Sequence, residues 1–170
     1  MSLVGVSTID LAAASTGDFT WLTGAHKCLK ILGNNIVPPD GSNSQFRLST
    51  DGSTFLAGTS YLYSGATYTS STEVRIGSTG AAEVPLHNLS GAVGGEGFGF
   101  EMMLYSLELA RHTSFFSSAS GETSASAGRT QYNTGYLNSA AEVLGIRFLN
   151  SAGTNYTSGL IWIYEYTAPA

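Results

Sequence analysis

The sequence has few charged residues and no cluster of cations. Lys, Arg, Asp and Glu make up 11% of the 170 residues, whereas an average soluble domain has about a quarter. The formal net charge is -5, and the seven Lys and Arg residues are scattered along the chain. Nucleic-acid binding requires clustered cations that displace counterions from phosphate. We therefore expect no nucleic-acid partner.

Cysteine and long apolar runs are also scarce. Cys28 is the single cysteine, which excludes a disulfide within the chain. No apolar run reaches the roughly 18 residues of a membrane helix, so we expect no membrane insertion. The first ten residues, MSLVGVSTID, lack a basic segment followed by an apolar one, so no secretory signal peptide is predicted.

Motifs for catalysis and metal binding are missing as well. His26, His87 and His112 stand far apart in the sequence, with no H-x-H or H-E-x-x-H spacing. The chain has no G-x-S-x-G nucleophile motif. The segments that contain Asp40 and Asp51 carry oxygen ligands but lack the bidentate Glu of a calcium loop, and calcium binding there is left open. We therefore predict no catalytic residue, metal ligand or cofactor, and no enzyme activity.

What the sequence does contain is alternation of apolar and polar residues. In Gln45–Gly65, Phe46 and Leu48 alternate with polar residues, which is the period of a strand with one buried face. Asp51-Gly52 follows, a dipeptide typical of a tight hairpin turn. Aromatic residues and Thr in Phe55–Tyr63 favour a second strand. The segment is therefore predicted to be a β-hairpin.

The same pattern continues to the end of the chain. Phe98, Phe100, Met102 and Leu104 fall on one face of a predicted strand. The Ser-, Ala- and Gly-rich segment 117–128 is predicted to be an exposed loop. In all, about eight to ten short strands with regular turn signals are expected. They predict an all-β fold, an antiparallel two-sheet β-sandwich of jelly-roll type, in one domain over residues 1–170, with residues 1–17 as an extended arm.

The remaining signal is a set of tyrosines in the predicted strands. Tyr61, Tyr63, Tyr68, Tyr132 and Tyr136 are the candidate contact residues. A Tyr ring packs on apolar surface while its hydroxyl forms hydrogen bonds, so these residues suit glycan binding. They equally suit a core or a subunit interface, where Tyr is also enriched. Their placement in predicted strands favours the core or interface alternative, while glycan binding stays open.

Segments at the two ends of the chain resemble bacteriophage virion surface-appendage proteins of the tail-fibre and head-fibre type. In the first half, the resemblance lies in the strand-like segments Lys27–Ile31, Phe46–Leu48 and Tyr61–Tyr63, with an Asp-Gly turn between the last two. In the second half it lies in Leu144–Phe148, a Gly/Asn turn, and Ser158–Tyr164. It covers no catalytic motif and transfers no functional residue.

The resemblance implies a structural role in a virus particle. The expected partners are other virion proteins and further copies of the chain, with a trimer favoured, and the expected location is the virion, after assembly in the host cytoplasm. The alternative function is a module that binds carbohydrate or a host-receptor glycan. A third hypothesis is a polysaccharide hydrolase with Glu96 and Glu101 as its carboxylates.

Overall fold

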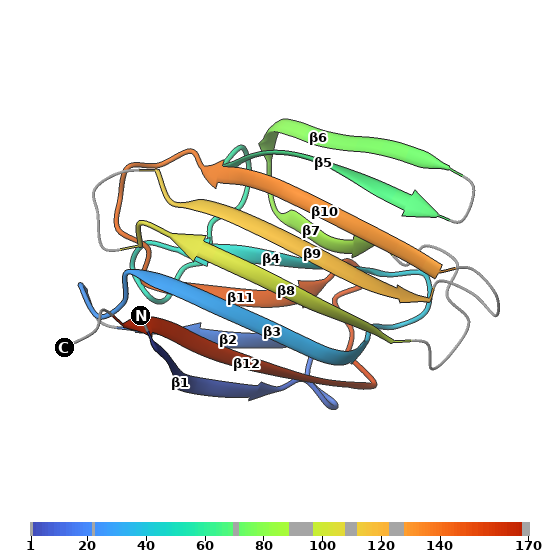
Figure 1. Ribbon diagram of the computed structural model, residues 1–170, viewed down its shortest axis with the longest axis horizontal. Coiled ribbons are helices and arrows are strands. Elements are labelled where there is room, and N and C mark those ends of the chain that lie inside the picture. The colour runs from blue at the N-terminus through green and yellow to red at the C-terminus, as the bar shows by residue number, and fades with distance from the viewer. Residues whose placement is uncertain are drawn as a thin grey trace.

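The chain folds into two antiparallel β-sheets packed face to face (Figure 1). The fold is taken from a computed structural model that describes residues 2–21, 23–69, 72–88, 97–107, 112–122 and 128–167. These residues form twelve strands and no helix. None of them therefore belongs to a helix long and apolar enough to cross a membrane. The predicted all-β, two-sheet sandwich is confirmed.

Eight strands form the large sheet and four form the small one. The large sheet has the spatial order β1 (Ser2–Asp10), β12 (Ser158–Thr167), β3 (Cys28–Val37), β8 (Phe98–Tyr105), β9 (Ser114–Glu122), β10 (Gly128–Leu137), β5 (Tyr61–Thr69) and β6 (Glu73–Ala81). The small sheet has the order β2 (Thr16–Thr20), β11 (Gly145–Asn150), β4 (Asn43–Ser49) and β7 (Val84–Asn88). Residues 2–10, expected within an extended arm, are thus an edge strand paired with β12.

The alternation of residues decides which side of each strand is buried. On β8, Met102 and Leu104 are fully buried while Glu101 and Tyr105 are exposed, as predicted. On β12, Ile161 and Ile163 are likewise buried against the small sheet. Successive strand residues point to opposite faces. One residue in two therefore enters the core, and the others cover the outside of the sheet.

Aromatic rings from both sheets meet in the centre of the core. Phe46 on β4 lies edge-to-face with Phe115 on β9, with ring centroids 5.2 Å apart and planes at 87°. Phe46 also contacts Tyr61 on β5, with centroids 6.5 Å apart. Edge-to-face pairs add about 0.5–1.5 kcal/mol to the gain from burial itself. This cluster ties the two sheets together.

The predicted hairpin at Asp51-Gly52 is wrong. β4 belongs to the small sheet and β5 to the large one, so the segment between them crosses from one sheet to the other. The Asp51 carboxylate accepts hydrogen bonds from the backbone N–H groups of Ser53 and Thr54, and these bonds hold its pKa well below the usual range. The Asp side chain therefore organises a longer loop in place of a two-residue turn.

The predicted loop 117–128 is also wrong in its first half. β9 continues to Glu122, paired with β8 on one side and β10 on the other. Small residues are required there because a Cβ atom at Gly121 would lie 2.5 Å from the Cβ atom of Phe98. Composition typical of a loop was thus overridden by pairing on both sides of the strand.

The hydroxyl of Tyr61 links the two sheets with hydrogen bonds. Tyr61 is fully buried, and its hydroxyl oxygen lies 2.6 Å from the backbone nitrogen of Leu48 on β4, from which it accepts a hydrogen bond. It also donates to the carbonyl oxygen of Leu56 at 3.1 Å. Burial raises the pKa of this phenol to about 12. Tyr61 is therefore a structural residue of the core.

Replacing Tyr61 with Phe should destabilise the protein without changing its shape. The ring would still fill the core, but the buried N–H of Leu48 would lose its acceptor, at a cost of about 1–3 kcal/mol. Urea unfolding measures this as a lower free energy of unfolding. The control is Tyr68→Phe on the exposed face, which should change that free energy by no more than about 0.5 kcal/mol. Equal effects of the two substitutions would contradict the proposed role of the hydroxyl.

Candidate functional site

The five candidate tyrosines fall into two groups in the structure. Tyr61 is part of the core and is not accessible to a ligand. Tyr63 is half-buried on β5, where burial raises its pKa. Tyr68, Tyr132 and Tyr136 lie on the outer face of the large sheet and are 41%, 42% and 39% exposed. The structure therefore brings three of the five to one accessible surface.

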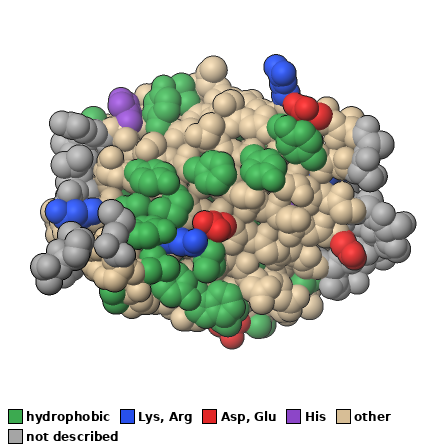
Figure 2. Space-filling view, in the orientation of Figure 1, with side chains coloured by type: hydrophobic (Ala, Val, Ile, Leu, Met, Phe, Trp, Pro, Cys, Tyr) green, Lys and Arg blue, Asp and Glu red, His purple; other side chains and the backbone are tan. Residues whose placement is uncertain are grey.

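Two further aromatic residues complete this surface. Tyr105 on β8 and Phe116 on β9 are each 41% exposed, and both point outward from the large sheet. With Tyr132 on β10 and Tyr68 on β5 they occupy four adjacent strands. We refer to Tyr105, Phe116, Tyr132 and Tyr68 as the aromatic stripe. Figure 2 shows the hydrophobic side chains gathered in a row across this face.

The strand register explains why the four rings form a line. Phe116 lies opposite Thr134, two residues from Tyr132. Tyr132 likewise lies opposite Ala66, two residues from Tyr68 on β5. Tyr105 lies opposite Ser114, two residues from Phe116. Diagonal neighbours of this kind are about 7–8 Å apart. The stripe therefore crosses the strands obliquely in single file.

The planes of neighbouring rings are not parallel. The ring centroids of Tyr68 and Tyr132 are 6.1 Å apart, and their planes meet at 73°. Tyr136 stands beside the stripe and packs edge-on against His112, with centroids 5.3 Å apart. The rings of Tyr68 and Tyr132 therefore do not form one flat plate.

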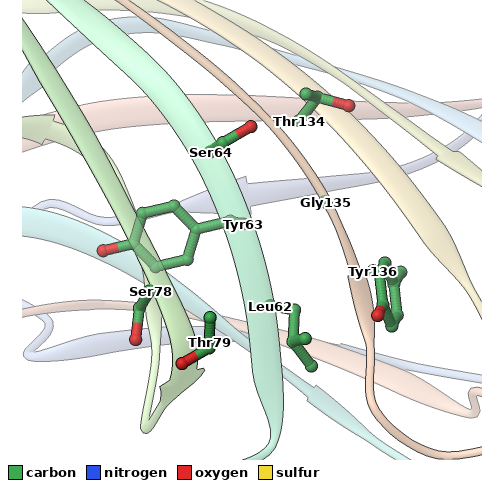
Figure 3. A pocket seen from close by; sticks show the side chains of 8 residues that line it. All are labelled: Leu62, Tyr63, Ser64, Ser78, Thr79, Thr134, Gly135 and Tyr136. Carbon is green, nitrogen blue, oxygen red and sulfur yellow. The ribbon is translucent and has the colours of Figure 1, made fainter.

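Hydroxyl groups surround the stripe. The other outward positions on β9, β10 and β5 are mainly Ser and Thr, namely Ser114, Ser118, Ser120, Thr130, Thr134 and Ser64. Beside Tyr136 the surface dips into a hollow of about 400 Å³ (Figure 3). Its lining residues are Leu62, Tyr63, Ser64, Ser78, Thr79, Thr134, Gly135 and Tyr136. The hollow thus offers hydroxyl donors and acceptors next to an aromatic ring.

Two pairs of opposite charges lie near the stripe. Lys30 and Glu101 form an ion pair of 3.0 Å on β3 and β8. Arg75 and Glu73 lie 3.8 Å apart on β6, where Glu73 is opposite Tyr68. Figure 2 shows blue side chains beside red ones on this face, and a red one that stands apart. Glu122, at the end of β9, is exposed on the same face, so the charges around the stripe are two opposite pairs and one further carboxylate.

The described residues contain no group of three or more His, Cys, Asp or Glu that could hold a metal ion. Of the two carboxylates considered for a hydrolase, Glu101 pairs with Lys30, and Glu96 lies outside the described residues. Asp51, considered for calcium, uses its Oδ1 atom to accept backbone hydrogen bonds. The feature best suited to contact another molecule is therefore the aromatic stripe with its hydroxyl surround.

A buried histidine near β10 is the most strongly perturbed base of the described residues. His87 is fully buried, and its ring stacks on Phe98 with centroids 4.8 Å apart. Its Nε2 atom lies 3.3 Å from the carbonyl oxygen of Arg129 and donates to it. Burial lowers the pKa of His87 to about 4. The hydrogen bond opposes this shift, while the Arg129 guanidinium adds to it. His87 is therefore neutral at physiological pH.

The low pKa of His87 should make the protein less stable in acid. The unfolded chain binds a proton here below about pH 6.5, whereas the folded chain does so only below about pH 4. Stability is then fully present above pH 6.5 and falls by about 3 kcal/mol as the pH drops to 4. Urea unfolding across this range should show the fall, and His87→Gln should remove it. The same pH dependence in both proteins would contradict the assignment.

Comparison with known proteins adds no assignment. No protein-family model matches the chain, and no curated protein matches it. The resemblance to phage appendage proteins therefore remains a prediction from the sequence.

Proposed function

We propose that the protein is a non-catalytic structural component of a bacteriophage or phage-like particle, a fibre, tail or capsid-surface protein, that acts through assembly with further copies of itself. The resemblance of the two ends of the chain to virion appendage proteins supports the proposal that the particle is a bacteriophage or resembles one. The observation that carries the assembly role is the edge strand β1.

β1 has the properties of a strand that pairs with another chain. It lies at one end of the large sheet, and within the described residues its one partner strand is β12. Natural edge strands are commonly protected by Lys, Pro or short length. β1 is nine residues long, SLVGVSTID, with neither Lys nor Pro, and its pairing with β12 has one register shift, between Gly5 and Ser7. Its free edge therefore presents backbone donors and acceptors without these protections.

Apolar side chains lie on both faces of β1. Leu3 is 43% exposed and Val4 is 48% exposed, and successive residues of a strand point in opposite directions. Leu3 lies opposite Tyr166 on β12, and Gly5 lies opposite Tyr164. A second chain that paired with β1 would bury Leu3, Val4 and the neighbouring Tyr rings together with the free backbone groups.

The assembly role is tested by the mass of the protein in solution. Light scattering at increasing concentration should give a multiple of the mass of one chain, with a trimer as the favoured state. The double substitution Leu3→Lys and Val4→Lys should shift the mass to that of a single chain, because the new charges oppose burial of the edge. The control is Tyr132→Ser, which removes an exposed ring far from β1 and should leave the mass unchanged.

The particle itself is tested by mass spectrometry of purified virions from the source of the gene. The protein should be found in the particles at a constant ratio to the major capsid protein. A chain that stays monomeric at high concentration and is absent from particles would contradict the proposed function.

A further inference from the structure

We propose that the aromatic stripe is a binding track for a single chain of an uncharged, linear polysaccharide. The inference rests on the outer face of β8, β9, β10 and β5. It does not depend on the assembly role assigned to β1.

The chemistry of the stripe suits the faces of sugar rings. A pyranose has an apolar face of C–H groups and a rim of hydroxyls, and aromatic rings pack on such apolar faces. Diagonal positions on adjacent strands are about 7–8 Å apart, so the four residues mark a track roughly 20–25 Å long. The 73° angle between the planes of Tyr68 and Tyr132 means that these two rings do not share one plane, which disfavours the flat surface of a crystalline polymer.

The surround of the stripe suits the rim of the sugar. Ser118 lies between Phe116 and Ser120 on β9, and Thr134 lies between Tyr132 and Tyr136 on β10. Each hydroxyl is both a donor and an acceptor, as the hydroxyls of a sugar are. The hollow of about 400 Å³ beside Tyr136 adds further hydroxyls, and its size is within the range of small-molecule sites.

Charge selects the class of polysaccharide. The outward positions Leu62–Tyr68, Ser114–Ser120 and Thr130–Tyr136 carry no ionisable group other than tyrosine phenols. The nearest charged side chains form the opposite pairs Lys30–Glu101 and Glu73–Arg75, and Glu122 at the end of β9 adds an exposed carboxylate on the same face. The chain as a whole has a net charge of -5, which repels an acidic polymer. The track therefore suits a neutral ligand.

The exposed area of the rings matches a narrow ligand. Each ring of the stripe is 41% or 42% exposed, and a whole aromatic side chain has about 200 Å² of surface, so the four rings offer roughly 300 Å². A single polysaccharide chain covers a stripe of this width.

Affinity electrophoresis of the intact protein tests the proposal. Native gels would contain soluble glucomannan, xyloglucan, mixed-linkage glucan, dextran or linear galactan as neutral probes, and polygalacturonate or hyaluronan as acidic ones. At least one neutral polymer should retard the protein, and the acidic polymers should not. No retardation by any neutral probe, or stronger retardation by an acidic probe, would overturn the proposal.

Two substitutions locate the binding on the stripe. Phe116→Ser and Tyr132→Ser should each lower the affinity for the polymer, measured from the retardation, roughly tenfold. This is the loss expected for one aromatic contact. Tyr132→Trp should restore it, and its indole fluorescence should shift when the polymer binds. The matched control is Val74→Ser, which removes a 52% exposed apolar side chain from β6, outside the stripe. Unchanged retardation by Phe116→Ser and Tyr132→Ser, with the melting temperatures preserved, would overturn the proposal.

The same proteins separate polysaccharide binding from assembly. The Leu3→Lys, Val4→Lys protein should still bind the neutral polymer, even if it is monomeric. The Tyr132→Ser protein should bind roughly tenfold more weakly but keep its mass in solution. If Tyr132→Ser and Phe116→Ser lowered the mass instead, the stripe would be an interface between copies of the chain, and the proposal would fail.

Discussion

Burial of one face of the large sheet against the small sheet is the interaction on which the rest of the structure depends. Each fully buried Phe, Leu or Ile side chain contributes about 1.5–3 kcal/mol, and the core contains many of them on both sheets. Phe46, Phe115 and Tyr61 meet at its centre. Alternate residues of each strand must be apolar to fill this core. The intervening residues face outward, and packing in the core does not restrict their type.

The outer face of the large sheet uses that freedom in an unusual way. A solvent-facing sheet normally carries Lys, Glu and similar residues between its apolar contacts, but here Ser and Thr take those places and aromatic rings stand among them. Such a face is poorly suited to acidic or basic partners. The two proposed activities are placed on separate parts of the large sheet, with assembly at the β1 edge and polysaccharide binding on the strands from β8 to β5.

Local patterns in the sequence predicted the strands and their faces well. Phe98, Met102 and Leu104 point inward as their alternation indicates, and Tyr68, Tyr132 and Tyr136 are exposed on the outer face of the large sheet. Tyr61 was grouped with them because it has the same residue type and strand context. Its hydrogen bond to Leu48, which fixes it in the core, depends on the packing of two different sheets. The members of the stripe on β8 and β9, Tyr105 and Phe116, had no distinguishing signal of their own.

By itself, the sequence determined an all-β chain with no disulfide, few charges and alternating strands, because each of these properties is set by composition or by neighbours two residues apart. Only the tertiary structure decided which strands are adjacent and in which register. Asp51-Gly52 illustrates the difference, since its turn chemistry is local but the strands beside it belong to different sheets. The aromatic stripe exists because distant segments of the chain pair as adjacent strands. Their register offsets Tyr68, Tyr132 and Phe116 from one another by two residues per strand. Register is fixed by burial of the opposite face, so no local pattern in the sequence could reveal it.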